Sequence, residues 1–337
     1  MPNRHRKHQL PKVLFLVKRK SDSAGYSTFE SGLHNSCRLT LEALLNHGLV
    51  KDGKVVVCFD GNSIDKELTL FKPNICFIDA VWVTPKKLVE IQRLHKKVKF
   101  VIRVHSNIPF LALEGNAIQW LTEYENIPNV TISFNNKKTT DYFKGIFINP
   151  IYIPNIYEAE FKKSAAIDGQ LNIGCFGAIR PLKNQLIQAV AAINLANAIG
   201  ATLRFHINAS RIEQSGEGIL KNMRALFKGK HKLIEHRWLP HAAFMNLISK
   251  MDCGLQVSYT ESFNIISADF IYSGTPIIVS HDIDWMSEPA KVDPNNAFEI
   301  ASKLYDVISH RDRYIRRAKK AIKEYNSDSL EVWEAFL

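Results

Sequence analysis

Short apolar runs alternate along the chain with longer segments in which apolar residues recur every three or four positions. Such runs are typical of buried parallel strands, and such segments are typical of helices that cover a sheet. In the first half the pattern predicts strands at 12–17, 54–60, 75–78, 100–104, 130–134 and 146–153, and helices that include 31–47 and 85–95. This alternation predicts a doubly wound α/β sheet.

The same pattern starts again in the second half. It predicts strands at 171–176, 203–207, 232–235, 253–257 and 276–279, with helices from about 184 to 200, 241 to 250 and 310 to 325. Pro150 and Pro154 flank the exit from the first half and indicate a linker. We therefore expect two facing Rossmann-like domains with a cleft between them, residues 1–152 and 153–326.

The segment from Gly254 to Pro276 combines a buried strand, a polar loop, a helix that we expect to open near residues 261–263, and a Gly-Thr-Pro turn. A loop at the carboxyl edge of a parallel sheet is where open α/β sheets bind ligands. Glu261 and Asp269 are eight residues apart, so they share roughly one face if both are helical. The sequence predicts a binding site here.

Two loops of the first half follow predicted strands and supply further candidates. The turn after the first strand contains Ser23, Gly25 and Tyr26, and the fourth strand runs directly into His105-Ser106-Asn107. A lone histidine is more often structural, but one at the carboxyl end of a strand is a better site candidate. We place these residues on the acceptor side of the cleft, with His105 as a catalytic candidate.

The turn after the first strand of the second half carries Gly177, Arg180 and Lys183. Glycine lets the backbone approach a ligand closely, and a helix N-terminus offers free N–H groups to an anion. Two nearby cations suit a diphosphate. The segment is neither a Walker loop nor a Gly-x-Gly-x-x-Gly fingerprint, and solvated basic residues are the commoner explanation of such a pattern when it stands alone.

Taken together, these segments resemble the group 1 family of GT-B glycosyltransferases, which are retaining enzymes that use nucleotide sugars. Residues 176–184 resemble the donor-phosphate turn of that family, and Ile153-Pro154-Asn155 resembles its interdomain Ile-Pro-Asn. The segment from Ser258 to Asp269, followed by Gly274-Thr275-Pro276, resembles its Glu-x7-Glu motif and the following Gly-x-Pro. The resemblance covers the second half; the first half matches in layout and at His105.

The resemblance implies a role for each matching residue. Arg180 and Lys183 would neutralise the diphosphate in place of a metal, Glu261 would bind the sugar hydroxyls, and His105 would face the sugar from the other domain. Gly177, Ser262 and the backbone around Phe263 and Asn264 would contact the donor. Asp269 stands where the family has a second Glu that holds the ribose, and its shorter side chain puts that contact in question. The segment 327–337 would cross back onto the first domain, with Leu330, Trp333 and Phe336 packing there.

The acidic triplet Asp282-Ile283-Asp284 has the form of an Asp-x-Asp metal motif, but its place after a late strand favours turn capping instead. No Cys-x-x-Cys occurs, and the five cysteines have no paired spacing. They predict buried reduced thiols in a cytoplasmic protein rather than zinc or disulfides. The sequence indicates neither a metal nor another cofactor beyond the nucleotide sugar, and no obligate protein partner.

Charge is the only guide to the acceptor. Residues 1–150 contain 22 Lys and Arg against 13 Asp and Glu, a net +9, whereas residues 151–337 contain 22 against 20, a net +2. We expect an acidic acceptor, and the leading hypothesis is a hydroxymethylated base in DNA, met by a basic cluster that includes Lys12, Lys18 and Arg19 at the cleft mouth.

Two other functions stay open. An anionic membrane surface that carries a polysaccharide or lipid-linked acceptor would attract the same charges, although the first half shows no obvious exposed amphipathic helix with bulky apolar residues. A nucleotide-sugar-binding protein without catalytic activity is the non-enzyme alternative.

Overall fold

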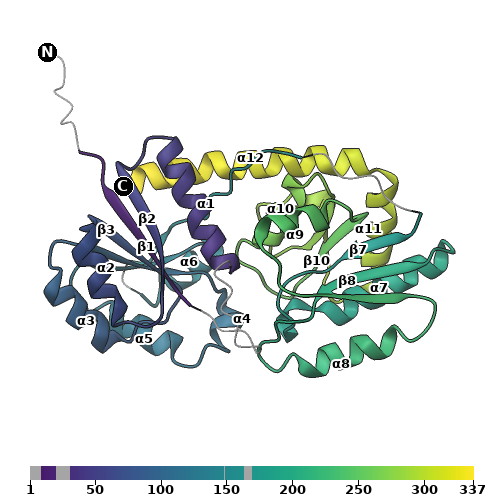
Figure 1. The fold of residues 1–337 in the computed structure, drawn as a ribbon, viewed down its shortest axis with the longest axis horizontal. Coiled ribbons are helices and arrows are strands. Elements are labelled where there is room, and N and C mark those ends of the chain that lie inside the picture. Colours follow the sequence, from purple (N-terminus) through teal and green to yellow (C-terminus); the bar gives the residue numbers. More distant parts are fainter. Residues whose placement is uncertain (1–8, 20–30, 148, 163–168) are drawn as a thin grey trace, which may run out of the picture.

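A computed structural model describes residues 9–19, 31–147, 149–162 and 169–337. It contains two six-stranded sheets, each flanked by helices, that lie side by side (Figure 1). Every strand pairing in both sheets is parallel. The predicted fold, two Rossmann-like domains in a GT-B arrangement, is confirmed.

The first sheet has the strand order β2-β1-β3-β4-β5-β6. Its strands are β1 (Lys12–Lys18), β2 (Asp52–Cys58), β3 (Ile75–Asp79), β4 (Lys99–Val104), β5 (Val130–Phe134) and β6 (Ile151–Tyr152). Its helices are α1 (Gly32–Asn46), α2 (Ser63–Phe71), α3 (Pro85–Leu94), α4 (Ile108–Leu111), α5 (Ala117–Tyr124) and α6 (Lys137–Phe143). The order starts at β1 and runs outward in both directions, which places the ends of β1 and β3 to β5 along the edge that faces the second domain.

The second sheet has the order β12-β11-β10-β7-β8-β9. Its strands are β7 (Leu171–Gly174), β8 (Leu203–Asn208), β9 (Lys232–His236), β10 (Cys253–Gln256), β11 (Ile277–Ser280) and β12 (Lys291–Val292). Its helices are η1 (Pro181–Lys183), α7 (Gln185–Ala198), α8 (Glu217–Leu226), α9 (His241–Ile248), α10 (Ile265–Tyr272), η2 (Glu288–Ala290), α11 (Ala297–Ser309) and α12 (Arg311–Phe336).

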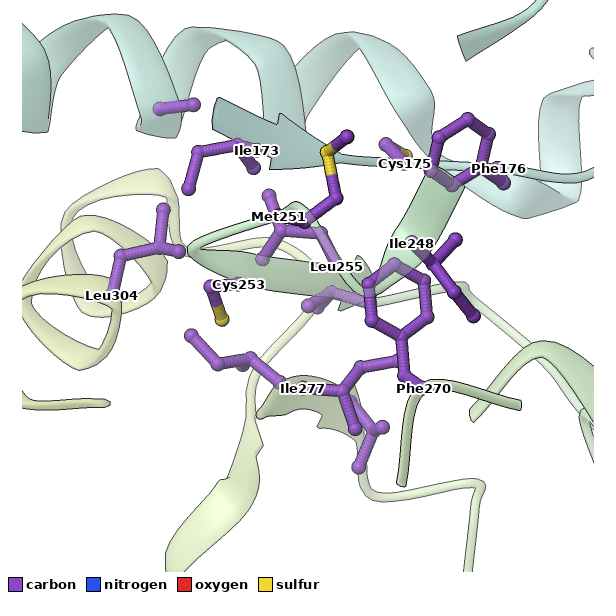
Figure 2. Packing of buried hydrophobic residues seen from close by; sticks show 14 of the residues in the cluster. Ile173, Cys175, Phe176, Ile248, Met251, Cys253, Leu255, Phe270, Ile277 and Leu304 are labelled. Atoms are coloured by element: carbon purple, nitrogen blue, oxygen red, sulfur yellow. The ribbon is translucent and has the colours of Figure 1, made fainter. Parts of the chain in front are cut away.

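The core of the second domain explains why its central strands are short apolar runs. Ile173, Cys253 and Leu255 are fully buried between the sheet and its helices (Figure 2). Phe270 packs so closely on β10 that a Cβ added at Gly254 would lie 2.7 Å from its ring. All five cysteines are buried and free, as the sequence predicts.

The C-terminal helix differs from its predicted extent. The sequence predicts a helix to about residue 325 and a separate crossing segment, whereas α12 is one continuous helix of 26 residues that reaches from the second domain to the first (Figure 1). Trp333 is fully buried and packs against Phe15 and Phe77 of the first sheet; its ring centroid lies 6.2 Å from that of Phe15, in a tilted arrangement, and 5.2 Å from that of Phe77, edge to face. Burying the tryptophan favours continuing the helix over breaking it.

Two other predicted bounds are wrong. The strand expected at 146–153 is reduced to Ile151–Tyr152. The helix expected to open near residues 261–263 begins at Ile265, because Asn264 adopts a left-handed conformation with φ of 59° and caps the helix through Ser267 N. Glu261 therefore lies in a loop and does not share a helix face with Asp269.

Candidate active site

The site lies where loops at the carboxyl edges of the two sheets touch. The Asn107 side chain donates to the backbone oxygen of Glu261 at 2.5 Å, and the Ser262 hydroxyl donates to the backbone oxygen of His105 at 2.7 Å. Each bond joins the two domains. The loops that the sequence singled out in each half are thus in direct contact.

Lys183 and Glu261 form a buried ion pair at this junction. Their side chains are only 10% and 6% exposed, and the Lys183 ammonium donates to Glu261 Oε1. Burial is the main cause that lowers the pKa of Lys183 below its usual value, and Arg180 acts in the same direction while Glu261 opposes it. The pair joins a residue expected to bind phosphate to one expected to bind sugar.

Gly177 shapes the turn next to this pair. Its φ is +115°, and a Cβ there would lie 3.2 Å from Ile266, so the turn requires glycine. The Gly177 N–H donates to the side chain of Asn208 at 2.9 Å. The turn continues through η1 to Asn184. This residue has a left-handed φ of 56° and directly precedes helix α7.

Arg180 reaches across toward the first domain. Its guanidinium lies 4.3 Å from the ring centroid of Phe110 in α4 and 3.2 Å from Glu213 Oε2. The two basic residues belong to one turn, in which the Lys183 N–H donates to Arg180 O at 3.0 Å, and the charge of Arg180 lowers the pKa of Lys183. The structure therefore brings together the two basic residues that the sequence assigned to one anion site.

Both ring nitrogens of His105 contact other side chains of the protein, which the sequence did not predict. Its Nε2 lies 2.7 Å from Asp79 Oδ1, and its Nδ1 lies 3.2 Å from the side-chain nitrogen of Asn135. If Nε2 carries the proton for the carboxylate, Nδ1 is free to accept from the amide. Both ring nitrogens are thereby engaged, and a contact with a sugar through the ring nitrogens requires one of these bonds to open.

Asp79 links this histidine to the linker between the domains. It is fully buried and also pairs with Arg103 Nη1 at 3.2 Å. Burial would raise the pKa of Asp79, but the hydrogen bond from His105 and the charge of Arg103 lower it below its usual value. Arg103 in turn donates to Pro154 O at 2.8 Å and to Asn155 Oδ1 at 2.5 Å. Asp79 directly follows the strand predicted at 75–78 and was not among the candidate site residues.

Asn135 and Asn136 were also missed, and they directly follow β5. Asn135 donates to Ser262 Oγ at 3.3 Å, and Asn136 donates to Asp284 Oδ2 at 3.5 Å. Their position directly after a predicted strand could have identified them as site candidates, because ligands bind at the carboxyl ends of parallel strands. With Asn107 they form a row of amides, named here the amide seam, which holds the loop 260–264 from the first domain.

Phe263 and Asn264 have mainly structural contacts. Phe263 is buried between Trp285 and Tyr325, with ring centroids 5.4 and 5.3 Å away, and its carbonyl accepts from Trp285 Nε1. Asn264 donates to Gln256 Oε1 at 2.8 Å. Both residues fix the loop, and their predicted donor contacts stay predictions.

Asp269 lies apart from Glu261, on a small apolar cavity of about 70 Å³ between the domains. Its Oδ1 accepts from the Tyr157 hydroxyl at 2.5 Å and lies 2.7 Å from His241 Nε2. Asn35 and Gly32 at the start of α1 line the cavity from the first domain, and Trp238 lines it from the second. The shorter acidic side chain is thus held in place by a tyrosine and a histidine.

The acidic triplet also has structural contacts. Asp282 accepts from the backbone N–H of Glu261 at 3.3 Å. Burial raises the pKa of Asp284 above its usual value. Among the residues that the structure describes, no three His, Cys, Asp or Glu side chains are grouped to hold a metal ion.

The acceptor-side residues are only partly brought to the cleft. Asn107 lies in it, whereas the Ser106 hydroxyl donates to Glu114 Oε1 at 2.6 Å within the first domain. Ser23, Gly25 and Tyr26 lie outside the described residues. The placement of Lys12 at the cleft mouth is wrong: it starts β1 at the opposite edge of the sheet, where it pairs with Asp52 at 3.6 Å.

No helix in the described part of the chain has both the length and the apolar character needed to cross a membrane. Neither a protein-family model nor a curated protein matches the sequence.

Solved structures are similar over nearly the whole chain. HepE of Anabaena in complex with UDP-glucose is 13% identical with a TM-score of 0.67, over 96% of this chain and 100% of HepE. The trehalose-6-phosphate synthase OtsA is 11% identical with a TM-score of 0.67, over 96% and 97%. A UDP-forming trehalose-phosphate synthase from Burkholderia xenovorans is 12% identical with a TM-score of 0.61, over 96% and 97%. At these identities the similarity concerns the fold, and the chain shares the two-domain GT-B fold of these proteins.

Proposed function

We propose that this protein is a retaining glycosyltransferase that takes a sugar from a nucleotide-sugar donor without a metal ion. The observation that carries the proposal is the buried Lys183–Glu261 pair beside the Gly177 turn, in a cleft that the amide seam closes from the other domain. The pair places a cation that would bind phosphate next to a carboxylate that would bind the sugar hydroxyls.

The chemistry follows from this arrangement. During transfer the bond between the anomeric carbon and the diphosphate oxygen breaks and a bond to the acceptor oxygen forms. The proton of the acceptor hydroxyl passes to the departing diphosphate. Lys183 and Arg180 would offset the negative charge that grows on the diphosphate, in a site that excludes most water. Glu261 would accept hydrogen bonds from the sugar, and Asp269 would lie beside the ribose.

The solved relatives support the choice of donor to test first. HepE is described with UDP-glucose, and the Burkholderia protein is described as UDP-forming. We therefore propose UDP-hexoses as the first donors, followed by other nucleotide sugars.

For the acceptor, the net +9 of the first half supports a polyanion, and a hydroxymethylated base in DNA is one candidate. A surface polysaccharide or a lipid-linked glycan is the other. Lys12, at the far edge of the sheet, does not help to present a base to the cleft, whereas Lys18 ends β1 at the edge that faces the cleft.

The test is a thermal-shift and product screen with a panel of nucleotide sugars, each with and without hydroxymethylated duplex DNA or glycan acceptors. A donor that occupies the site raises the melting temperature, and transfer adds the mass of one sugar to an acceptor. Glu261→Gln and Arg180→Ala should abolish turnover, whereas Glu235→Gln, a surface residue paired with Arg224, should leave it unchanged.

A nucleotide-sugar-binding protein without activity gives a different result. In that case a donor raises the melting temperature, but neither hydrolysis nor transfer occurs with any acceptor. If no nucleotide sugar changes the melting temperature, the proposed function is wrong.

A further inference from the structure

A basic hollow lies on the first domain at the edge opposite the cleft. It is an open depression of about 710 Å³ between the ends of α2 and α3 and the starts of β3 and β4. Four exposed cations line it: Lys72, Arg93, Lys96 and Lys97. None of its lining residues is acidic.

These four cations make no ion pair with any residue in the described ranges. The acidic side chains of α2 and α3 have other partners: Asp65 lies 2.7 Å from His95, Glu67 pairs with Lys54 at 2.9 Å and Glu90 with Lys87 at 2.8 Å. Asp328, Glu331 and Glu334 lie on α12, which packs on the opposite face of the sheet. The positive charge of the hollow is therefore concentrated on one exposed side.

Bulky apolar side chains accompany the charge. Leu94 lines the hollow and is 63% exposed, and Leu70, in the last turn of α2, is 69% exposed. Exposed leucines among lysines contribute nothing to binding a phosphate backbone, but they insert into the boundary between lipid headgroups and acyl chains. These two leucines stand at the ends of α2 and α3, helices whose other faces pack on the sheet.

We propose that this hollow docks the protein on an anionic membrane surface. Lys72, Arg93, Lys96 and Lys97 would meet the acidic headgroups, and Leu94 and Leu70 would enter the interface. The surface is separated from the cleft by the length of the β4 strand, about 20 Å at roughly 3.3 Å per residue. Docked in this way, the cleft stays open to the solution, so docking and sugar transfer are independent properties.

The direct test is cosedimentation of the full chain with vesicles of phosphatidylglycerol and phosphatidylcholine, compared with vesicles of phosphatidylcholine alone. The wild type should bind the anionic vesicles at low salt and lose binding as salt increases. Lys96→Glu/Lys97→Glu should weaken binding by on the order of tenfold or more. Arg316→Glu/Arg317→Glu on α12 carries the same change in net charge and should bind like the wild type.

Leu94→Ser separates a membrane from a nucleic acid. It should weaken vesicle binding while leaving any retention of duplex DNA unchanged. The proposal is overturned if the wild type does not bind anionic vesicles, or if the α12 variant loses as much vesicle binding as Lys96→Glu/Lys97→Glu. It is also overturned if Leu94→Ser has no effect on vesicle binding and duplex DNA competes fully with the vesicles.

Unchanged melting temperatures will show that the variants are folded. Donor turnover by Lys96→Glu/Lys97→Glu should equal that of the wild type. If Lys96→Glu/Lys97→Glu loses vesicle binding but keeps donor turnover, the result supports the docking surface and says nothing about the enzyme. If the wild type binds vesicles but turns over no donor, only the proposed enzyme activity is contradicted.

Discussion

Glu261 is bonded from three directions: Lys183 donates to its carboxylate, Asn107 donates to its backbone oxygen, and its backbone N–H donates to Asp282. Lys183 reaches it from the turn after β7 and Asn107 from the other domain. The position of one carboxylate therefore depends on both that turn and the contact between the domains.

Removing one member of this pair should cost stability. Glu261→Gln leaves the buried Lys183 ammonium without its partner, which should destabilise the fold by about 3–5 kcal/mol in urea unfolding and lower the pKa of Lys183 further. The double variant Lys183→Met/Glu261→Gln should recover part of the loss, because no charge remains buried. Glu235→Gln should cost at most about 1 kcal/mol; an equal loss there would contradict a special role for the pair.

The burial of His105 predicts how stability depends on pH. Burial lowers the pKa of His105 below its usual 6.5. Below 6.5 the unfolded chain therefore binds a proton that the folded protein does not, and the free energy of unfolding falls as the pH drops toward the folded pKa. The contribution of Asp79, whose pKa is lowered from 3.8, is lost only at still lower pH.

Urea midpoints between pH 8 and 5 measure this effect. The wild type should lose more stability over this range than His105→Gln, which cannot bind the proton. Burial also lowers the pKa values of His231 and His236, but these residues are present in both proteins and cancel in the comparison. Parallel curves for the two proteins would show that His105 does not titrate differently on unfolding.

Trp333 should be the main anchor of α12 on the first domain. Its ring is fully buried near Phe15 and Phe77, and its Nε1 donates to Pro154 O at 2.9 Å. Trp333→Ala should lower the free energy of unfolding by about 3–5 kcal/mol. Phe298→Ala removes a side chain that is 80% exposed and should change stability by less than about 0.5 kcal/mol.

The amide seam should affect turnover more than folding. Asn107→Ala removes the bond to Glu261 O, and a loss of about 1 kcal/mol should lower kcat/KM by roughly fivefold. Asn135→Ala removes the amide beside His105 Nδ1 and should shift the pH profile of kcat as well. Asn129→Ala, whose amide bonds Lys96 O far from the cleft, is the matched control. An unchanged kcat/KM in Asn107→Ala would separate the seam from the chemistry.

The sequence alone determined the fold class and the segments that build the site. Periodic apolar runs indicate which faces must be buried, and a glycine after a predicted strand, such as Gly177, indicates a turn where the backbone can approach a ligand closely. Local pattern therefore placed Arg180, Lys183, Glu261 and His105 at strand ends on the correct sheet edges.

Only the tertiary structure decided which of these residues touch. The Lys183–Glu261 pair spans 78 residues and the Asn107–Glu261 bond spans 154, separations at which sequence pattern carries no distance information. For the same reason the sequence did not reveal the contacts of Asp79 and of the amide seam. Lys12 was placed at the wrong edge of the sheet because a count of charges does not say at which edge they lie. Net charge is a sum over a domain, whereas binding depends on the positions of individual charges.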